Sequence, residues 1–256
     1  MKVKKIIFSP TGGTEKVASI IAKNISEDIT NIDLCNPNLD FQNVIIDESD
    51  IVIIAMPSYG GRAPKPAIER LKQIQGNQAK CIIVCVYGNR AYEDTLVEME
   101  DAASAANFKV IAAIAAIAEH SIMHQYATGR PDSNDEANLT NIVRDILNKN
   151  KDKITKIPGN RPYKKAMGAS VVPQPNKKCI KCGLCAKACP VGAIDPVTFK
   201  ADKKKCISCM RCIKVCPHNA REVNKLLVSA AAMAIKKACT QRKECELFLT
   251  DKILED

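Results

Sequence analysis

Eight of the thirteen cysteines lie in two groups whose spacing can bring sulfur atoms together. In each group three cysteines stand three positions apart, and a fourth follows four positions later, directly before a proline. The groups are Cys179, Cys182, Cys185 and Cys189, and Cys206, Cys209, Cys212 and Cys216. A short looped backbone with this spacing can aim three thiolates at three corners of one [4Fe–4S] cluster.

The two groups are copies of one repeat. Every one of the four cysteines, and the proline after the last, recurs at an offset of 27 residues. In such a duplicated unit the cysteine before proline ligates the other cluster. We therefore predict two [4Fe–4S] clusters, one held by Cys179, Cys182, Cys185 and Cys216, the other by Cys206, Cys209, Cys212 and Cys189.

A pair of zinc sites is the alternative for these cysteines. Zinc also binds four thiolates, but its usual motifs separate two Cys-x-x-Cys pairs by a longer loop. The eight positions resemble those of a bacterial-type ferredoxin with two [4Fe–4S] clusters. Lys187, Lys214 and His218 are predicted to be surface residues.

Composition indicates a soluble, cytoplasmic protein. The chain has 256 residues, 46% of them hydrophobic, and no apolar run near the roughly 18 residues that span a bilayer. No secretory signal follows the short apolar start. In a reducing compartment cysteines favour metal binding over disulfides. The remaining cysteines are predicted to be packed thiols; they are Cys35, Cys81, Cys85, Cys239 and Cys245.

The formal charge of +10 does not by itself indicate nucleic-acid binding. Two oxidised clusters with their thiolates contribute roughly −4, and a flavin phosphate about −2 more. The loaded protein would then carry about +4, and no nucleic-acid motif is present. We expect no nucleic-acid partner.

A loop of small and hydroxyl residues lies between the first predicted strand and the first predicted helix. Ser9-Pro10-Thr11-Gly12-Gly13-Thr14 can bring backbone N–H groups onto a phosphate at a helix N-terminus. It lacks the Lys-Ser/Thr end of a nucleotide P-loop and the glycine spacing of a dinucleotide fingerprint. An ordinary strand-to-helix turn is the alternative.

Residues 1–150 alternate apolar runs with helix-like segments. The expected strands are 3–8, 31–35, 50–56, 79–87 and 108–117, and the expected helices are 15–24, 66–74, 92–106 and 133–148. Ser133 and Glu136 are typical of a capping box at the last of these. Buried strands separated by helices predict a doubly wound, parallel five-stranded α/β sheet.

The loops of this region resemble the flavin-binding loops of flavodoxins. Ser9 to Thr14 is similar to the phosphate loop, and 57–62 and 87–92 follow the third and fourth strands as the two flavin-facing loops do. The resemblance implies strand order 2-1-3-4-5 and FMN bound by Ser9, Thr11, Gly12, Gly13, Thr14, Pro57, Ser58, Tyr59, Gly60, Gly61, Tyr87, Gly88, Asn89, Arg90 and Tyr92. Tryptophan, common in such loops, is absent.

The chain as a whole resembles flavodoxin–ferredoxin fusion proteins. This implies a flavodoxin-like FMN domain at 1–150, a basic linker at 151–175, a smaller α+β ferredoxin domain at 176–222 and a helical extension at 223–256. Val223, Leu226, Leu227, Ala230 and Ala234 share one helix face in that extension. We expect this face to pack on the ferredoxin unit or the sheet.

Three functions fit this combination. The first is an electron carrier that relays electrons between the clusters, FMN and a redox protein acting as donor or acceptor. The second is an enzyme, a flavin-dependent reductase of a small acceptor bound near Tyr59, Arg90 and His120. The third is a redox sensor that finds its partner through the basic linker. Catalytic residues and oligomeric state do not follow from the sequence.

Two further hypotheses concern charged side chains near the predicted flavin. Arg62 and Arg90, if they reach it, would favour the anionic reduced ring. His120 and His124 stand four positions apart and could share a helix face, with His120 as an acid/base group.

Overall fold

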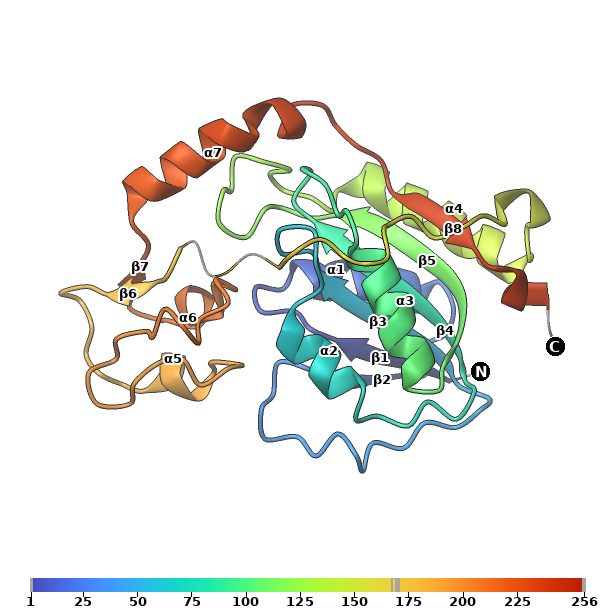
Figure 1. The fold of residues 1–256 in the computed structure, drawn as a ribbon, viewed down its shortest axis with the longest axis horizontal. Helices are drawn as coiled ribbons and strands as arrows, with labels where there is room; N and C mark the ends of the chain where they lie inside the picture. The colour runs from blue at the N-terminus through green and yellow to red at the C-terminus, as the bar shows by residue number, and fades with distance from the viewer. Residues whose placement is uncertain (1, 167, 169–170, 255–256) are drawn as a thin grey trace.

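The larger lobe of the molecule is built on a parallel sheet (Figure 1). The computed structural model describes residues 2–166, 168 and 171–254. Five strands lie in the order β2-β1-β3-β4-β5, all parallel, which confirms the predicted order. They are β1 (Val3–Ile7), β2 (Ile29–Asp33), β3 (Ile51–Pro57), β4 (Lys80–Tyr87) and β5 (Lys109–Ile117).

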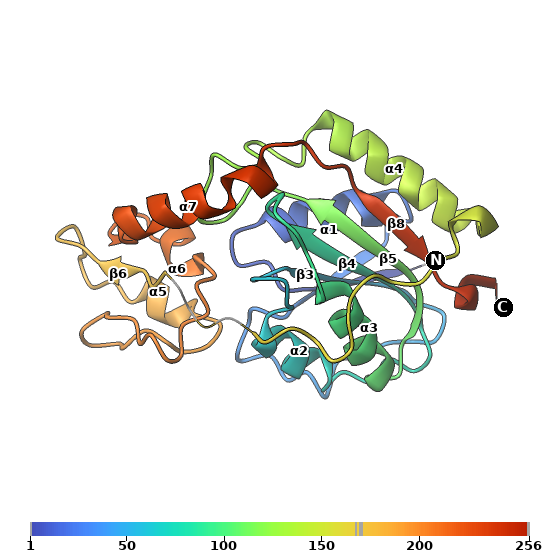
Figure 2. The same cartoon turned by 45° about the horizontal axis from the view of Figure 1, so that its top comes forward.

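Helices cover both faces of this sheet because β3, β4 and β5 are apolar on both sides. One face carries α1 (Gly13–Lys23) and α4 (Ser133–Leu147), and the other carries α2 (Lys65–Leu71) and α3 (Thr95–Ala105), as Figure 2 shows. The result is the flavodoxin-like doubly wound arrangement. Ligands of such sheets bind outside the carboxyl ends of the strands, where the loops after β1, β3 and β4 lie.

A sixth strand corrects the five-stranded prediction. β8 (Glu246–Leu249) pairs antiparallel with β5 and forms the sheet edge. The extension at 223–256 is therefore not wholly helical, because its only long helix among the described residues is α7 (Lys225–Cys239). After β8 comes a short 3-10 turn, η2 (Asp251–Leu254).

Two local predictions in the larger lobe were wrong. The capping box of α4 uses Asp132 and Asp135, one position earlier than predicted, because Asp132 is the N-cap. The Asp132 side chain accepts from the backbone of Asn134 and Asp135. His120 and His124 do not share a helix face, since they lie in the loop between β5 and α4.

The basic linker lies against the larger lobe. After η1 (Lys151–Lys153), Ile154 bridges to Leu249 of β8. Arg161 pairs with Glu100 and Asp101 on α3 at 2.8 and 2.7 Å. The positive charge of Arg161 is therefore neutralised by carboxylates of α3. Residues 167, 169 and 170 of this linker lie outside the described residues.

The smaller lobe holds both cysteine motifs. It contains β6 (Gln174–Pro175) paired antiparallel with β7 (Arg221–Glu222), and two single-turn helices, α5 (Leu184–Lys187) and α6 (Arg211–Lys214). From β7 the chain continues into α7, which arches back to the larger lobe (Figure 1). Among the described residues, no helix has the length and apolar character to cross a membrane.

α7 does not pack as predicted. Leu226 and Leu227 are 81% and 55% exposed, and Ala230 and Ala234 are also exposed. The buried positions of the helix are Ala232 and Cys239. The predicted apolar face is therefore on the surface, because the helix bridges the lobes and does not lie flat on either.

A substitution at Leu249 tests the placement of β8 directly. It is fully buried against the main core, so Leu249→Ala should lower the free energy of unfolding by about 2–5 kcal/mol. Leu226→Ala, on the exposed part of α7, should change it by less than about 0.5 kcal/mol. Urea denaturation followed by circular dichroism measures both. Equal losses would contradict the placement of β8.

Candidate iron–sulfur and flavin sites

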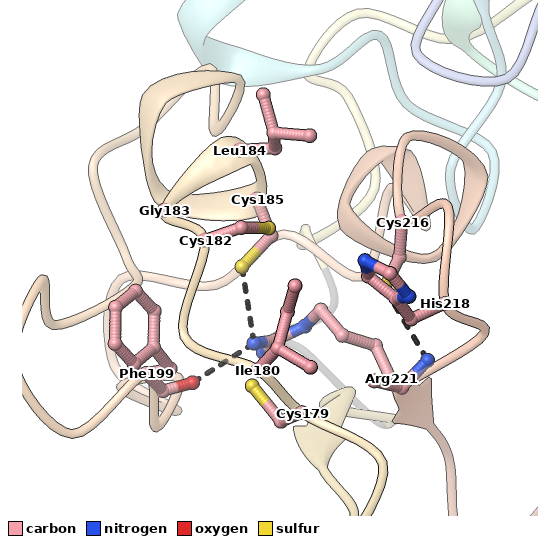
Figure 3. Close-up of a pocket in the computed structure, with 11 residues that line it drawn as sticks. Cys179, Ile180, Cys182, Gly183, Leu184, Cys185, Phe199, Cys216, His218 and Arg221 are labelled. Atoms are coloured by element: carbon pink, nitrogen blue, oxygen red, sulfur yellow. Dashed lines mark hydrogen bonds between the residues drawn. The ribbon is translucent and has the colours of Figure 1, made fainter.

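Four cysteines line a cavity at the outer side of the smaller lobe, which we call the outer cavity (Figure 3). They are Cys179, Cys182, Cys185 and Cys216. The cavity measures about 320 Å³ including its open mouth. Cys185 is buried and Cys182 is exposed, so the site reaches solvent. Exposed apolar side chains, Ile180 and Leu184, stand at its rim.

The other four cysteines line a second cavity, the inner cavity, which measures about 340 Å³ including space open to solvent. They are Cys189, Cys206, Cys209 and Cys212. Burial raises the pKa of the Cys209 thiol to about 12, and its three cysteine neighbours add to this rise. Each cavity takes three cysteines from one motif and the fourth from the other. The ligand sets predicted from the repeat divide the cysteines in the same way, and their binding of clusters stays a prediction.

Cys189 and Cys216, which each join the three cysteines of the other motif, accept equivalent backbone hydrogen bonds. The Ala193 N–H donates to Cys189 Sγ at 3.3 Å, and the Ala220 N–H donates to Cys216 Sγ at 3.3 Å. These donors are themselves 27 residues apart. Within the described part of the chain, no three His, Cys, Asp or Glu side chains gather closely enough to hold a single metal ion. Four thiols around a hollow fit a [4Fe–4S] cluster.

The inner cavity faces the larger lobe. Pro190, on its wall, accepts a hydrogen bond from Arg70 of α2, and Arg211 of α6 lies 3.8 Å from Asp33 at the end of β2. Ile207, also on its wall, packs against the main core. The inner cavity is thereby held at the edge of the sheet where β2 ends.

The loop at 9–14 has the features of an anion site. Gly12 is the N-cap of α1 with φ +99°, a conformation that suits glycine, and this residue has no side chain to cap the helix. A Cβ placed on Gly12 would meet nothing within 4 Å, so the space before the helix is open. Ser9 Oγ accepts from the Glu15 N–H at 2.9 Å and holds the loop closed. The residues fit a phosphate at this helix N-terminus.

The loop after β3 lies beside the inner cavity. Tyr59 and Arg62 close this loop through a pair of backbone hydrogen bonds. Burial raises the pKa of the Tyr59 hydroxyl, and the nearby sulfurs of Cys209 and Cys35 contribute. Cys35 itself accepts a hydrogen bond from the Ser9 backbone N–H. Electrostatic influence thus links Cys35 and Tyr59 of the larger lobe to Cys209 of the inner cavity.

The loop after β4 is used by the C-terminal segment. The Asn89 side chain donates to the carbonyls of Cys239 and Gln241, each at 2.8 Å. The Tyr92 hydroxyl donates to Glu246 of β8 at 2.6 Å, and its ring packs edge-on against Tyr87. Asn89 and Tyr92 were predicted to bind flavin, but their side chains bind the segment from the end of α7 to the start of β8. The backbone of this loop is the part left for a ligand.

Neither arginine is a free charge at the predicted flavin site. Arg62 forms a two-pronged pair with Glu98 at 2.6 and 2.7 Å, and Arg90 pairs with Glu93 at 2.9 Å. The side chain of Glu98 also accepts from the Ala63 N–H. The structure does not support the hypothesis that Arg62 raises the flavin potential, because its charge is already matched.

His120 lies against the loop after β4. A Cβ on Gly88 would come within 2.6 Å of its ring, so only glycine allows this packing. His120 Nδ1 accepts from the backbone of Ile122 and Met123, and burial lowers the pKa of the ring. Because Nδ1 is an acceptor here, the neutral form of the ring carries its hydrogen on Nε2.

Two important residues were missed by the sequence analysis. Cys35 belongs to no motif, and its place beside Cys209 depends on how the lobes meet. Arg221 lines the outer cavity and is buried. Comparing the two copies of the repeat could have identified it. The equivalent position in the first copy is Ile194, so an arginine stands where the repeat has an apolar residue.

The comparisons with known proteins divide the chain in the same way. Residues 178–220 match the family model of the 4Fe-4S dicluster domain. Among curated proteins, none matches the chain. A flavodoxin from Streptococcus pneumonia TIGR4 is 18% identical, covers 58% of this chain and 99% of its own, and has a TM-score of 0.41.

Two further solved flavodoxins are similar in the same range. One from the domain Archaea is 14% identical, with 59% of this chain and 99% of its own covered and a TM-score of 0.43. The two-electron reduced flavodoxin of Megasphaera elsdenii is 15% identical, with 54% and 94% covered and a TM-score of 0.38. The strand order of the larger lobe and the family match of the smaller one confirm a flavodoxin-like fold joined to a 4Fe-4S ferredoxin-type domain.

The crossing of the cysteines between motifs can be tested by comparing three variants. Cys216→Ala should lower the iron content from about eight to about four per chain, because it lines the outer cavity. The electron paramagnetic resonance spectrum of its reduced form should match that of Cys182→Ala. A match to Cys209→Ala instead would contradict the crossing. Cys239→Ala, buried outside both cavities, should keep all the iron.

Proposed function

We propose that the protein relays electrons between a redox partner, two [4Fe–4S] clusters and FMN, in the order outer cluster, inner cluster, flavin. FMN exchanges one or two electrons and each cluster exchanges one, so the combination can gather or split electron pairs. The observation that carries the proposal is the placement of the inner cavity against the larger lobe, where Arg70 donates to the Pro190 carbonyl and Arg211 lies 3.8 Å from Asp33.

Each part of the proposed relay has its own residues. The outer cluster would be held by Cys179, Cys182, Cys185 and Cys216, and the inner cluster by Cys189, Cys206, Cys209 and Cys212. The FMN phosphate would take backbone N–H groups of the loop at 9–14, as supported by the open space at Gly12 before the helix N-terminus. Tyr59 would lie between the ring and the inner cluster, with Gly60 and Gly61 giving the backbone close access.

The proposed domain limits follow the same division. A flavodoxin-like domain would comprise 1–150 together with β8, and the ferredoxin-type domain would comprise 176–222. The linker at 151–175 and α7 would connect them. The charge pairs of Arg161 with α3 favour a structural linker over a docking site for a sensor partner.

The second candidate function is a flavin-dependent reductase, which the position of His120 favours. His120 lies near the carboxyl end of β5, and the Nε2–H of its neutral ring could donate a hydrogen bond to an acceptor bound there. Arg90, which the same hypothesis places beside the substrate, is paired with Glu93. Steady turnover of a small acceptor distinguishes this function, because a relay passes its electrons to another protein.

The relay is tested by removing the phosphate site alone. Protein purified anaerobically should contain about eight iron and one FMN per chain. Thr11→Glu should lose FMN and keep its iron, because a carboxylate in the loop repels the phosphate. Thr240→Glu, which makes the same change on the exposed end of α7, should keep both.

Rapid mixing with a limiting one-electron donor then follows the route. In the unmodified protein, bleaching of the cluster absorbance should precede bleaching of the flavin. In Thr11→Glu the clusters should stay reduced. The proposal fails if FMN does not bind, or if the flavin is reduced equally fast in protein whose iron has been removed.

A further inference from the structure

The rim of the outer cavity combines apolar exposure with positive charge. Ile180 is 62% and Leu184 46% exposed, and both line the cavity beside the exposed Cys182. Exposed lysines flank these positions in the chain; they are Lys177, Lys178, Lys181 and Lys187. A small apolar centre within a charged rim is the usual anatomy of a transient protein interface.

The charge of the whole smaller lobe has one sign. Residues 176–220 contain nine lysines and one arginine against two aspartates and no glutamate. Even with about −2 from each loaded cluster, this surface stays positive. Such a surface attracts an acidic protein over long range and sets its orientation before contact.

We propose that the rim of the outer cavity is the docking surface for an acidic redox protein, which exchanges electrons with the outer cluster. This inference rests on the proposed relay, since it names the partner class and the point of exchange. The inner cavity is turned toward the larger lobe by Arg70, Ile207 and Arg211, so the outer cavity is the one that a partner can approach.

A charge-reversal experiment tests the surface. An acidic plant-type ferredoxin, reduced beforehand, serves as the donor, and bleaching of the iron–sulfur absorbance is the readout. Lys178→Glu/Lys181→Glu should slow the second-order rate about tenfold at low salt and weaken its salt dependence. The matched control is Lys151→Glu/Lys153→Glu, which makes the same charge change in η1 on the larger lobe.

The two possible failures are distinguishable. Equal slowing in both double variants would show that only net charge matters and would overturn the docking surface, as would no slowing in either. Dithionite should reduce the clusters of all three proteins at one rate. Because the readout is cluster absorbance, absence of FMN would defeat the relay without affecting this test.

A separate observation concerns Arg221, whose buried charge lies between the two cavities. Its guanidinium donates to Cys185 Sγ of the outer cavity at 3.6 Å and to the Phe199 carbonyl at 2.8 Å (Figure 3). It also donates to the Pro173 carbonyl at 2.7 Å. Pro173 and Cys212 both line the inner cavity, and the positive charge of Arg221 opposes the rise that burial causes in the pKa of the Cys212 thiol. Arg221 therefore donates to a ligand cysteine of the outer site and acts electrostatically on one of the inner site.

This arginine has no anionic partner among the residues that the structure describes. It is 4% exposed, its Nε is buried without a hydrogen-bond acceptor, and no described carboxylate pairs with it. A buried cation without a counter-charge costs several kcal/mol. Clusters with their thiolates carry net negative charge, so a cluster on each side would supply what the arginine lacks.

We infer that Arg221 is the shared counter-cation of the two clusters and that it raises both of their reduction potentials. Positive charge and hydrogen bonds to the ligand sulfurs favour the more negative, reduced cluster. Because one guanidinium serves two sites, it also offsets the repulsion between electrons that occupy both clusters. Arg221 acts through the ligand cysteines and is a tuning residue, independent of whether FMN binds.

Redox titration monitored by electron paramagnetic resonance tests the role of Arg221. In Arg221→Gln the ratio of reduced to oxidised cluster at a given potential should fall at least tenfold for both clusters, equivalent to 59 mV for a one-electron couple. Lys214→Gln, which removes an exposed charge from the same lobe, should shift neither couple by that amount.

Arg221→Lys keeps the charge but cannot span both sites, so at least one couple should move. If Arg221→Gln does not retain its clusters, the lysine variant carries the test alone. Unchanged potentials in the lysine variant, or equal shifts in Lys214→Gln and Arg221→Gln, would overturn the inference.

Discussion

The position of the smaller lobe depends on one constraint: the chain leaves the larger lobe and returns to the same edge of its sheet. The outgoing segment bridges to Leu249 through Ile154, and the returning β8 pairs with β5. Asn89 and Tyr92 hold the return at the loop after β4. With both ends of the smaller lobe tied to one rigid sheet, its inner cavity stays beside the loops at the carboxyl ends of β1 and β3.

Electrostatics ties the two cysteine sites to the basic composition of the chain. The surface lysines of the smaller lobe are solvated at little cost, whereas Arg221 is buried without a described carboxylate. A cation in such a place is stable when its neighbours are anionic, and thiolate-ligated clusters are anionic. The surface charge would act on the encounter with a partner, and the buried charge would act on the potentials.

The parts predicted from the sequence are those set by local spacing. The cysteine grouping follows from a repeat in register, and the parallel sheet follows from continuous apolar runs such as 79–87. β8 was missed because four residues, ELFL, carry too short a pattern. The roles of Asn89 and Tyr92 could not be read, because their partners lie about 150 residues further along the chain. For α7, periodicity identifies an apolar face but cannot say whether anything covers it.

In the proposed relay, electron transfer inside the protein and electron exchange with a partner take place at different sites. Cys35 is buried and Tyr59 is partly buried beside the smaller lobe, which Arg70 and Ile207 hold against the sheet, so the proposed path from inner cluster to flavin would need no domain movement. Cys182 is exposed, so exchange at the outer cluster would depend on diffusion and encounter. Under this arrangement the encounter at the rim, and not the transfer inside the protein, is the step that charge and salt concentration would control.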